Sequence, residues 1–260
     1  MSKERIFEPY QKAERSIIKK YRKQLWSPFI YAIKHYDLIQ EGDRIAVCIS
    51  GGKDSMLMAK LMQELQRHSD FPFELEFLVM DPGYNEINRQ KIESNARLLH
   101  IPITIFETNV FEVANGSEKN PCYLCARMRR GHLYSKAKAL GCNKIALGHH
   151  YDDAVETLLM NLLFEGRIGC FQPVTYLDRT GITQIRPLLY CREEEIRRVA
   201  RRLELPVVEN PCPANGHSRR QEVKELIAGL EGRYPDIKQK LFGSLQRYPL
   251  YGWNLHEEER

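Results

Sequence analysis

The segment at 44–65 constrains the fold most, because an apolar strand pattern changes there into a helical one across a glycine-rich turn. Residues 44–49 form a short apolar run with β-branched residues, which is typical of a buried strand in a parallel sheet. From Asp54 onward the apolar positions follow a helical period. Gly51 and Gly52 fill the turn, where they permit positive φ angles and a close approach of the backbone to a ligand. The junction therefore predicts a βα unit whose turn binds an anion.

The residue types in this turn indicate that the anion is a phosphate. Free N–H groups at a helix start and the helix dipole favour phosphate, and we expect the hydroxyls of Ser50 and Ser55 to add two donors. An aspartate would repel phosphate unless a cation lay between them, so Asp54 predicts Mg²⁺. The longer phosphate loop of kinases and GTPases does not occur in the chain. An ordinary glycine-rich turn is the alternative. The predicted nucleotide-binding residues of the turn are Ser50, Gly51, Gly52, Lys53, Asp54 and Ser55.

The remaining pattern predicts an α/β fold, a Rossmann-like parallel sheet flanked by helices, with helical N- and C-terminal extensions. We expect the N-terminal extension at 1–40, broken at Pro28, the catalytic domain at 41–215 and the C-terminal extension at 216–260. Strands are expected at 43–49, 73–80, 102–107 and 143–148, and at 186–190 after a hairpin turn at 178–181. Helices are expected at 54–67, 86–99, 126–140, 152–164, 193–204, 222–230 and 237–245.

A second polar cluster follows the predicted strand at 143–148. Ligands of open α/β sheets bind at the carboxyl ends of the strands, so Gly148 and His149 are expected to contact the nucleotide. Asp153 is the expected second acid near Mg²⁺ or the reacting group. A capping box between Asp153 and Glu156 at the start of the next helix is the structural alternative.

Three cysteines form the third group of candidate site residues. Cys122 and Cys125 form a C-x-x-C pair after a proline, and Cys212 follows the same Asn-Pro-Cys opening. The prolines predict rigid loops that present these thiols. The residues alone leave three kinds of site open: a [4Fe–4S] cluster, a zinc site completed by His217 or His132, and a redox persulfide. The other four, predicted to be packed small hydrophobes, are Cys48, Cys142, Cys170 and Cys191.

Composition and charge narrow the class of protein. The 260 residues, 43% of them apolar, can bury a full core. Seven cysteines without a recognisable signal peptide predict reduced thiols in the cytoplasm, and no apolar run is long enough for a membrane span. The net charge is +5 and the basic residues are clustered, which favours nucleic acid as a partner over solvated helix faces alone. The clusters are Lys19 to Lys23, Arg127 to Arg130, Arg197 to Arg202, and Arg219 with Arg220.

Together these motifs resemble one known family. The stretches SGGKDS (50–55), CYLCARMRRG (122–131), KIALGHHYDD (144–153) and IRPLLYCREEEI (185–196), with Cys212, are similar to the tRNA 2-thiocytidine synthetase family, TtcA. This family belongs to the PP-loop ATP-pyrophosphatase superfamily, whose members have the adenine nucleotide alpha-hydrolase-like fold. The motifs occur in the family's order.

The resemblance implies an enzyme that adenylates C2 of a tRNA cytidine, at position 32, and replaces the oxygen with sulfur. It implies that residues 50–55 bind ATP, that Asp54 holds Mg²⁺, and that Arg129 or Arg130 stabilises phosphate charge. The catalytic residues expected are Asp54, Asp153 and Arg129, and the expected cluster ligands are Cys122, Cys125 and Cys212. The expected partners are tRNA, a sulfur donor (cysteine desulfurase or sulfide) and a second copy in a homodimer, with no membrane.

Three other functions remain as alternatives. The first is lysidine-type ligation, which needs no group of three cysteines. The second is the 2-thiouridine enzymes, which usually add cysteine-rich ribbons at both ends, whereas this chain has no cysteine before Cys48 or after Cys212. A zinc-bound, non-catalytic RNA-binding protein is the third. The chain departs from some family members at Asn215, where these carry a further cysteine.

Overall fold

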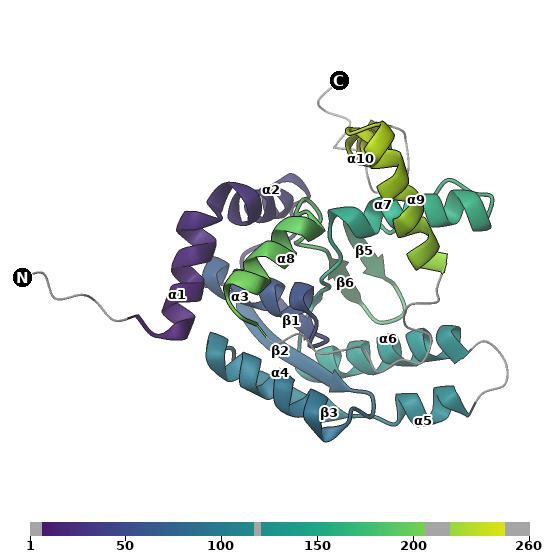
Figure 1. The fold of residues 1–260 in the computed structure, drawn as a ribbon. Coiled ribbons are helices and arrows are strands. Elements are labelled where there is room, and N and C mark those ends of the chain that lie inside the picture. The colour runs from purple at the N-terminus through teal and green to yellow at the C-terminus, as the bar shows by residue number, and fades with distance from the viewer. Residues whose placement is uncertain (1–6, 117–120, 206–218, 248–260) are drawn as a thin grey trace, which may run out of the picture.

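A computed structural model of the chain describes residues 7–116, 121–205 and 219–247 (Figure 1). The strands are β1 (Arg44–Ile49), β2 (Glu74–Asp81), β3 (Ile103–Glu107), β4 (Lys144–Ala146), β5 (Val174–Leu177) and β6 (Ile182–Ile185). The α-helices are α1 (Pro9–Arg15), α2 (Ser27–His35), α3 (Lys53–His68), α4 (Glu86–Leu99), α5 (Val110–Asn115), α6 (Pro121–Ala139), α7 (Tyr151–Phe164), α8 (Glu193–Arg202), α9 (Arg219–Arg233) and α10 (Ile237–Arg247). Two π-helical segments, η1 (Ser16–Lys20) and η2 (Arg22–Trp26), lie between α1 and α2.

The strands form one six-stranded sheet in the order β3-β2-β1-β4-β6-β5. All neighbouring pairs are parallel except β5 with β6, which form the predicted hairpin. The strand order reverses between β1 and β4, where Ile45 is paired with Lys144 and Val47 with Ala146. A crevice at such a reversal is the usual ligand site of an open α/β sheet. The predicted α/β fold with a Rossmann-like parallel sheet is confirmed.

Helices cover both faces of the sheet and divide its apolar contacts into separate clusters. The largest cluster joins the N-terminal helices, α3, α4 and α8 to one face. Helix α6 covers the other face through residues such as Ala137, which share a cluster with Ala46 and Leu78. A third cluster holds α9 and α10 against α7 (Figure 1). The carboxyl ends of β1 and β4 therefore open between α3 on one side and α6 on the other.

The N-terminal helices are tied to the sheet domain by a buried lysine. Lys60 of α3 is fully buried, and its ammonium group donates to Glu14 of α1 at 2.8 Å and to the Leu99 carbonyl of α4 at 3.0 Å. Gln63 supplies a third acceptor at 2.8 Å. A buried ammonium is tolerated when it is paired and hydrogen-bonded in this way. The described part of the N-terminal extension therefore packs into the largest apolar cluster.

Several predicted elements have different boundaries in the structure. The helix break predicted at Pro28 is wrong, because a wide turn with a hydrogen bond from the Ser27 N–H to the Arg22 carbonyl precedes the proline and the helix continues. The strand predicted at 186–190 is also wrong: the strand is β6, and this segment forms turns. Helix α6 begins at Pro121 rather than near residue 126, and α5 was not predicted.

In the described part of the chain, no helix combines the length and the apolar character that crossing a bilayer requires.

Candidate active site

The glycine-rich turn joins the carboxyl end of β1 to the amino end of α3. Gly51 has a φ of 82°, a left-handed conformation that glycine adopts without strain. Gly52 is the N-cap of α3 and is extended (φ −72°, ψ 158°), so the turn requires a positive φ at only one of the two predicted positions. No side chain of the described residues caps this helix start. The N–H groups of its first turn therefore retain donors for an anion.

The two serines have different roles in the turn. The Ser55 hydroxyl accepts from the Ser50 N–H at 3.1 Å and donates to the Gly52 carbonyl at 3.0 Å. Ser55 is buried, whereas Ser50 is exposed with its hydroxyl 3.1 Å from that of Ser55. Ser55 therefore closes the turn, and Ser50 is the more accessible of the two predicted phosphate donors.

Lys53 and Asp54 form a charged group at the start of α3. Lys53 Nζ lies 3.2 Å from Asp54 Oδ2 and 3.1 Å from Glu193 Oε1 of α8. Burial would lower the pKa of Lys53, but the charges of Asp54 and Glu193 outweigh it and raise the pKa above its usual value. Burial would likewise raise the pKa of Glu193, but Lys53 and Lys224 lower it to about 2. Lys53 is thus held as a cation beside the phosphate turn.

The second oxygen of Asp54 has no such partner. Asp54 Oδ1 is buried and makes no hydrogen bond to any described residue. His150 Nε2 lies 3.8 Å from this oxygen, which is too long for a hydrogen bond. An unpaired carboxylate oxygen beside free helix N–H groups fits a hard cation with oxygen ligands such as Mg²⁺.

His150 lies between the two predicted acids. Its Nδ1 accepts from the Asp153 N–H at 3.3 Å, so a neutral ring carries its proton on Nε2, the nitrogen that faces Asp54. Asp153 Oδ2 in turn accepts from the His150 N–H at 3.0 Å. The capping box considered as the alternative, between Asp153 and Glu156, is not the one found, because the box pairs His150 with Asp153. Asp153 is thus linked to Asp54 through His150.

Asp153 is also paired with a residue from the C-terminal helices. Arg220 Nη1 donates to Asp153 Oδ1 at 3.0 Å and to Glu156 Oε2 at 3.0 Å. Lys224, one turn further along α9, lies 3.6 Å from Glu156 and 3.5 Å from Glu193. Burial raises the pKa of Glu156 even with both cations beside it. Helix α9 therefore carries the counter-charges of the acids behind the phosphate turn.

One cavity of about 560 Å³ brings together residues from the predicted groups. Asp153 is not among the described residues that line the cavity, so its effect on a ligand there passes through its neighbours. Arg129 and Arg130 line the cavity from α6, on the wall opposite α3. The other lining residues include Ser50, Asp54, Ser55, Ala126, Gly148, His149, Phe171, Gln184 and Arg186.

Gly148 leaves room for a ligand at the start of α3. A Cβ at this position would lie 3.4 Å from the Ser55 backbone nitrogen and 3.5 Å from Ser55 Cα. The Ser55 N–H is one of the free donors of the first helical turn, so a methyl group there would cover it. A side chain at this position would therefore fit in ordinary van der Waals contact, but it would take space in front of the phosphate turn.

His149 and Arg186 form the polar end of the cavity. Burial lowers the pKa of His149 to about 4, and the charge of Arg186 adds to the effect, so the imidazole is neutral at pH 7. The His149 ring packs on Phe171 with the centroids 4.9 Å apart, and the Arg186 guanidinium lies 4.8 Å from the same ring. Neither His149 Nδ1 nor Arg186 Nε has a hydrogen-bond partner among the described residues. This end therefore offers unpaired nitrogens to a polar ligand.

The C-x-x-C pair is helical and lies close to the cavity. The predicted rigid loop is wrong, because Pro121 occupies the first position of α6, where its missing N–H is not needed. Cys125 is half-buried and lies one residue before Ala126 of the cavity wall. The Cys122 side chain, Cys212 and His217 lie outside the described residues. No group of three metal-ligating residues is found within the described ones.

The structure confirms the packing role predicted for most of the other cysteines. Cys48, Cys142 and Cys191 are buried, and Cys170 is half-buried. Burial raises the pKa of Cys48 and Cys170 to about 12 each and that of Cys142 to about 11. These thiols are protonated and unreactive at neutral pH.

Tyr84 is a site residue that the sequence did not reveal. Its hydroxyl donates to the Ser50 carbonyl at 3.2 Å and so supports the phosphate turn from the end of β2. Burial raises the pKa of Tyr84 although the positive charge of Arg129 lies beside it, and Cys125 is close enough to act on it too. The only sequence signal was the Pro-Gly turn directly before this residue.

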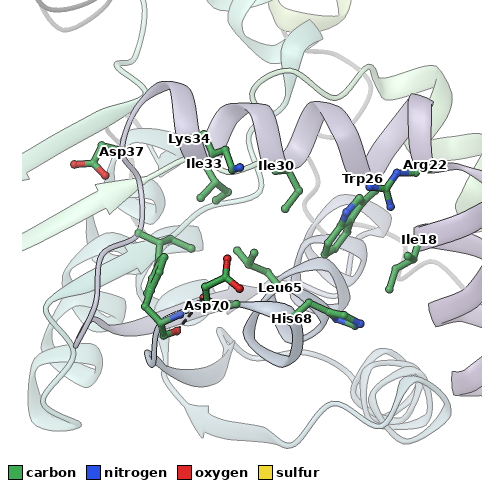
Figure 2. A pocket seen from close by; sticks show the side chains of 13 residues that line it. Ile18, Arg22, Trp26, Ile30, Ile33, Lys34, Asp37, Leu65, His68 and Asp70 are labelled. Carbon is green, nitrogen blue, oxygen red and sulfur yellow. Dashed lines mark hydrogen bonds between the residues drawn. The ribbon is translucent and has the colours of Figure 1, made fainter.

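A second cavity of about 590 Å³ lies at the other end of α3 (Figure 2). It contains none of the predicted site residues. Ile30 and Trp26 of the N-terminal helices face Leu65 and His68 of α3 across it. It lies at the carboxyl end of α3, where the helix dipole disfavours phosphate, and no glycine is among its described lining residues, so it does not compete with the first cavity as a nucleotide site.

Comparison with known proteins agrees with this fold. A family model described as a PP-loop domain matches residues 10–229. The solved U34-tRNA thiolase NcsA from Methanococcus maripaludis has a similar fold, with a TM-score of 0.68, 24% identity, and coverage of 84% of this chain and 76% of that chain. The chain belongs to the PP-loop family.

Curated relatives define the family more narrowly. A tRNA-cytidine(32) 2-sulfurtransferase from Pelobacter propionicus is 38% identical over 219 residues, 82% of this chain and 81% of the relative. The enzyme of the same name from Dechloromonas aromatica is 37% identical over 237 residues, 88% of this chain and 81% of the relative. The chain is a member of the tRNA-cytidine(32) 2-sulfurtransferase family, a family of transferases, as the sequence motifs predict.

Proposed function

We propose that the protein is an ATP-dependent tRNA sulfurtransferase that adenylates the C2 oxygen of cytidine 32 and replaces this oxygen with sulfur. The cavity of about 560 Å³ is the observation that carries the proposal. Its walls are formed by the phosphate turn, by Gly148 and His149 after the carboxyl end of β4, and by α6 directly after Cys125. A nucleotide, a base and a sulfur-bearing group can meet in such a space.

ATP would bind with its phosphates at the start of α3. The free N–H groups of the first helical turn and the Ser50 hydroxyl supply donors, and Gly51 and Gly148 keep the backbone accessible. Lys53 adds a fixed positive charge. These donors and charges bind the β- and γ-phosphates and leave the α-phosphate facing the cavity.

Asp54 would hold Mg²⁺ through its unpaired Oδ1. When bound, the metal ion would offset the negative charge of the phosphates. His150, held by Asp153, faces the same oxygen with its Nε2 at 3.8 Å. We therefore assign Asp153 a supporting role behind Asp54.

The reaction needs two displacements. In the first, the C2 oxygen attacks the α-phosphorus, the bond to the bridging β-phosphate oxygen breaks, and pyrophosphate leaves. In the second, a sulfide attacks C2, and the carbon–oxygen bond breaks with AMP as the leaving group. Arg129 and Arg130 line the cavity and would stabilise the negative charge that develops at the α-phosphate. The neutral imidazole of His149 and the guanidinium of Arg186 would hold the base by hydrogen bonds.

Cys122, Cys125 and Cys212 would hold a [4Fe–4S] cluster. The half-buried Cys125 thiol beside the cavity fits such a ligand, and the solved thiolase NcsA contains a cluster of this kind. When bound, the cluster would supply sulfide through an iron that no cysteine occupies. A cysteine desulfurase or free sulfide would be the source of this sulfur.

Nucleoside analysis of tRNA from cells that lack the protein tests this function. The proposal predicts that 2-thiocytidine disappears while 2-thiouridine and lysidine remain. Complementation with the parent gene should restore it, and complementation with a Cys125→Ser variant should not. Persistence of 2-thiocytidine in the deletion strain would refute the substrate assignment.

A further inference from the structure

Helix α8 presents a row of arginines on one exposed face. Ile196, Val199 and Ala200 are buried against the core. The helical period places the remaining positions on the opposite side, where the side chains are exposed. The exposed positions are Glu194, Arg197, Arg198, Arg201 and Arg202.

Acidic neighbours neutralise only the first half of this face. Arg197 is paired with Glu193 at 3.0 Å, and Arg198 with Glu194 at 2.7 Å. Arg201 and Arg202 form no ion pair with any described residue, and the last turn of α8 contains no acid. The charge of the helix therefore increases toward its C-terminal end.

The N-terminal helices extend this charge. Helix α8 packs against η2, and η2 packs against η1. Exposed cations that are not ion-paired within the described part of the chain are Lys19 and Lys20 of η1 and Arg22 and Lys23 of η2. We call these cations, with the two from α8, the α8–η surface: Lys19, Lys20, Arg22, Lys23, Arg201 and Arg202.

The surface is connected to the reaction site through the other end of α8. The first residue of the helix, Glu193, binds Lys53 of the phosphate turn at 3.1 Å. A helix of 10 residues is about 15 Å long, which spans several phosphates of one RNA strand. A polyanion on the α8–η surface is thus within one helix length of the phosphate turn.

We propose that the α8–η surface binds the phosphate backbone of the tRNA whose cytidine enters the cavity. The proposal rests on the proposed function. Unpaired guanidinium groups on a rigid helix match phosphates in geometry and charge, and an RNA backbone is long enough to contact α8 and both π-helical segments. The exposed face of α8 has no apolar side chain to insert into a membrane, which argues against a lipid surface.

The salt dependence of tRNA binding tests this surface. The double substitution Arg201→Gln with Arg202→Gln removes two phosphate contacts. We expect it to weaken tRNA binding about tenfold or more near physiological salt and to reduce the slope of log K against log salt by about two. ATP affinity and melting temperature should be unchanged, and Arg201→Lys with Arg202→Lys should retain the slope.

Lys138→Gln with Arg179→Gln is the matched control. Both residues are exposed: Lys138 lies on α6, and Arg179 lies in the turn between β5 and β6. The two substitutions remove the same total charge as the Arg201/Arg202 pair. This control should bind tRNA like the parent protein. Equal affinity and an equal slope for the Arg201/Arg202 variant would overturn the proposal while leaving the function intact. The finding that these two arginines bind an acidic protein in place of tRNA would have the same consequence. A parent protein that binds no tRNA would overturn both.

Discussion

Lys53 Nζ lies 3.1 Å from Glu193 Oε1, and this ion pair joins the phosphate turn to the first residue of α8. Glu193 also lies 3.5 Å from Lys224 of α9, and its N–H donates to Asp152 of α7 at 2.7 Å. The turn that would hold ATP is therefore braced from three helices that follow it in the chain.

Glu193→Gln should lower the free energy of unfolding by about 2 to 3 kcal/mol at pH 7. The pKa of Glu193 is held at about 2, below its usual 4.5, because Lys53 and Lys224 outweigh burial. This stabilisation is present above pH 4.5 and is lost as the pH falls toward 2. Urea unfolding at several pH values should show the difference from the parent narrowing below pH 4.5. Glu194→Gln, on the exposed face of the same helix, should change little; a comparable loss there would contradict this explanation.

Arg220→Gln should reduce kcat about tenfold without changing the KM for ATP. Arg220 binds both Asp153 and Glu156 at 3.0 Å, and without this charge the pKa of Glu156, which burial already raises, rises further. The acidic limb of the rate profile should therefore move to higher pH. Arg220→Lys should restore part of the rate, and Arg219→Gln, at the exposed neighbouring position, should behave like the parent. An unchanged pH profile would remove Arg220 from this role.

Gly148→Ala should weaken binding of a non-hydrolysable ATP analogue about tenfold, because the new methyl group would lie 3.4 Å from the Ser55 nitrogen and cover a phosphate donor. Calorimetric titration measures this directly. The control Gly229→Ala places a methyl group on α9 with no atom within 4 Å, and it should bind the analogue normally. Equal affinity of both variants would show that the phosphates do not approach this backbone.

Cys125→Ser should abolish bound iron and labile sulfide in protein purified without oxygen, while ATP binding remains. Cys170→Ser is the matched control, since the Cys170 thiol donates to the Ala154 carbonyl at 3.5 Å and a hydroxyl can do the same. Iron at the parent level in the Cys125 variant, or zinc in place of iron in the parent, would exclude the cluster.

Sequence alone predicted the features that depend on local pattern. The strand at 44–49, the helix after it and the phosphate turn follow from apolar periodicity and two glycines, and the structure has them at β1 and α3. Helix α4 matches its predicted range because an apolar stripe and an Asn85 N-cap define it. Such elements need few long-range contacts to be recognised.

Features that depend on distant partners were not predictable. Arg220 was assigned to an RNA-binding cluster, whereas its partner Asp153 lies 67 residues earlier in the chain. The start of α6 was placed too late because Pro121 was interpreted as ending an element and not as opening a helix. Tyr84 supports Ser50 across 34 residues. In each case tertiary contacts decided the role.

The central claim is that ATP bound at the phosphate turn activates a tRNA cytidine for sulfur transfer. The most direct measurement is nucleoside mass spectrometry of a tRNA incubated with reconstituted protein, ATP, Mg²⁺ and sulfide, using transcripts with cytidine or uridine at position 32. The proposal predicts that 2-thiocytidine forms with release of one AMP and one pyrophosphate per thiolation. No thiolated product should form with the uridine transcript, without ATP, or with Asp54→Ala protein that retains its iron. Thiolation without ATP, or by the Asp54→Ala protein, would contradict it.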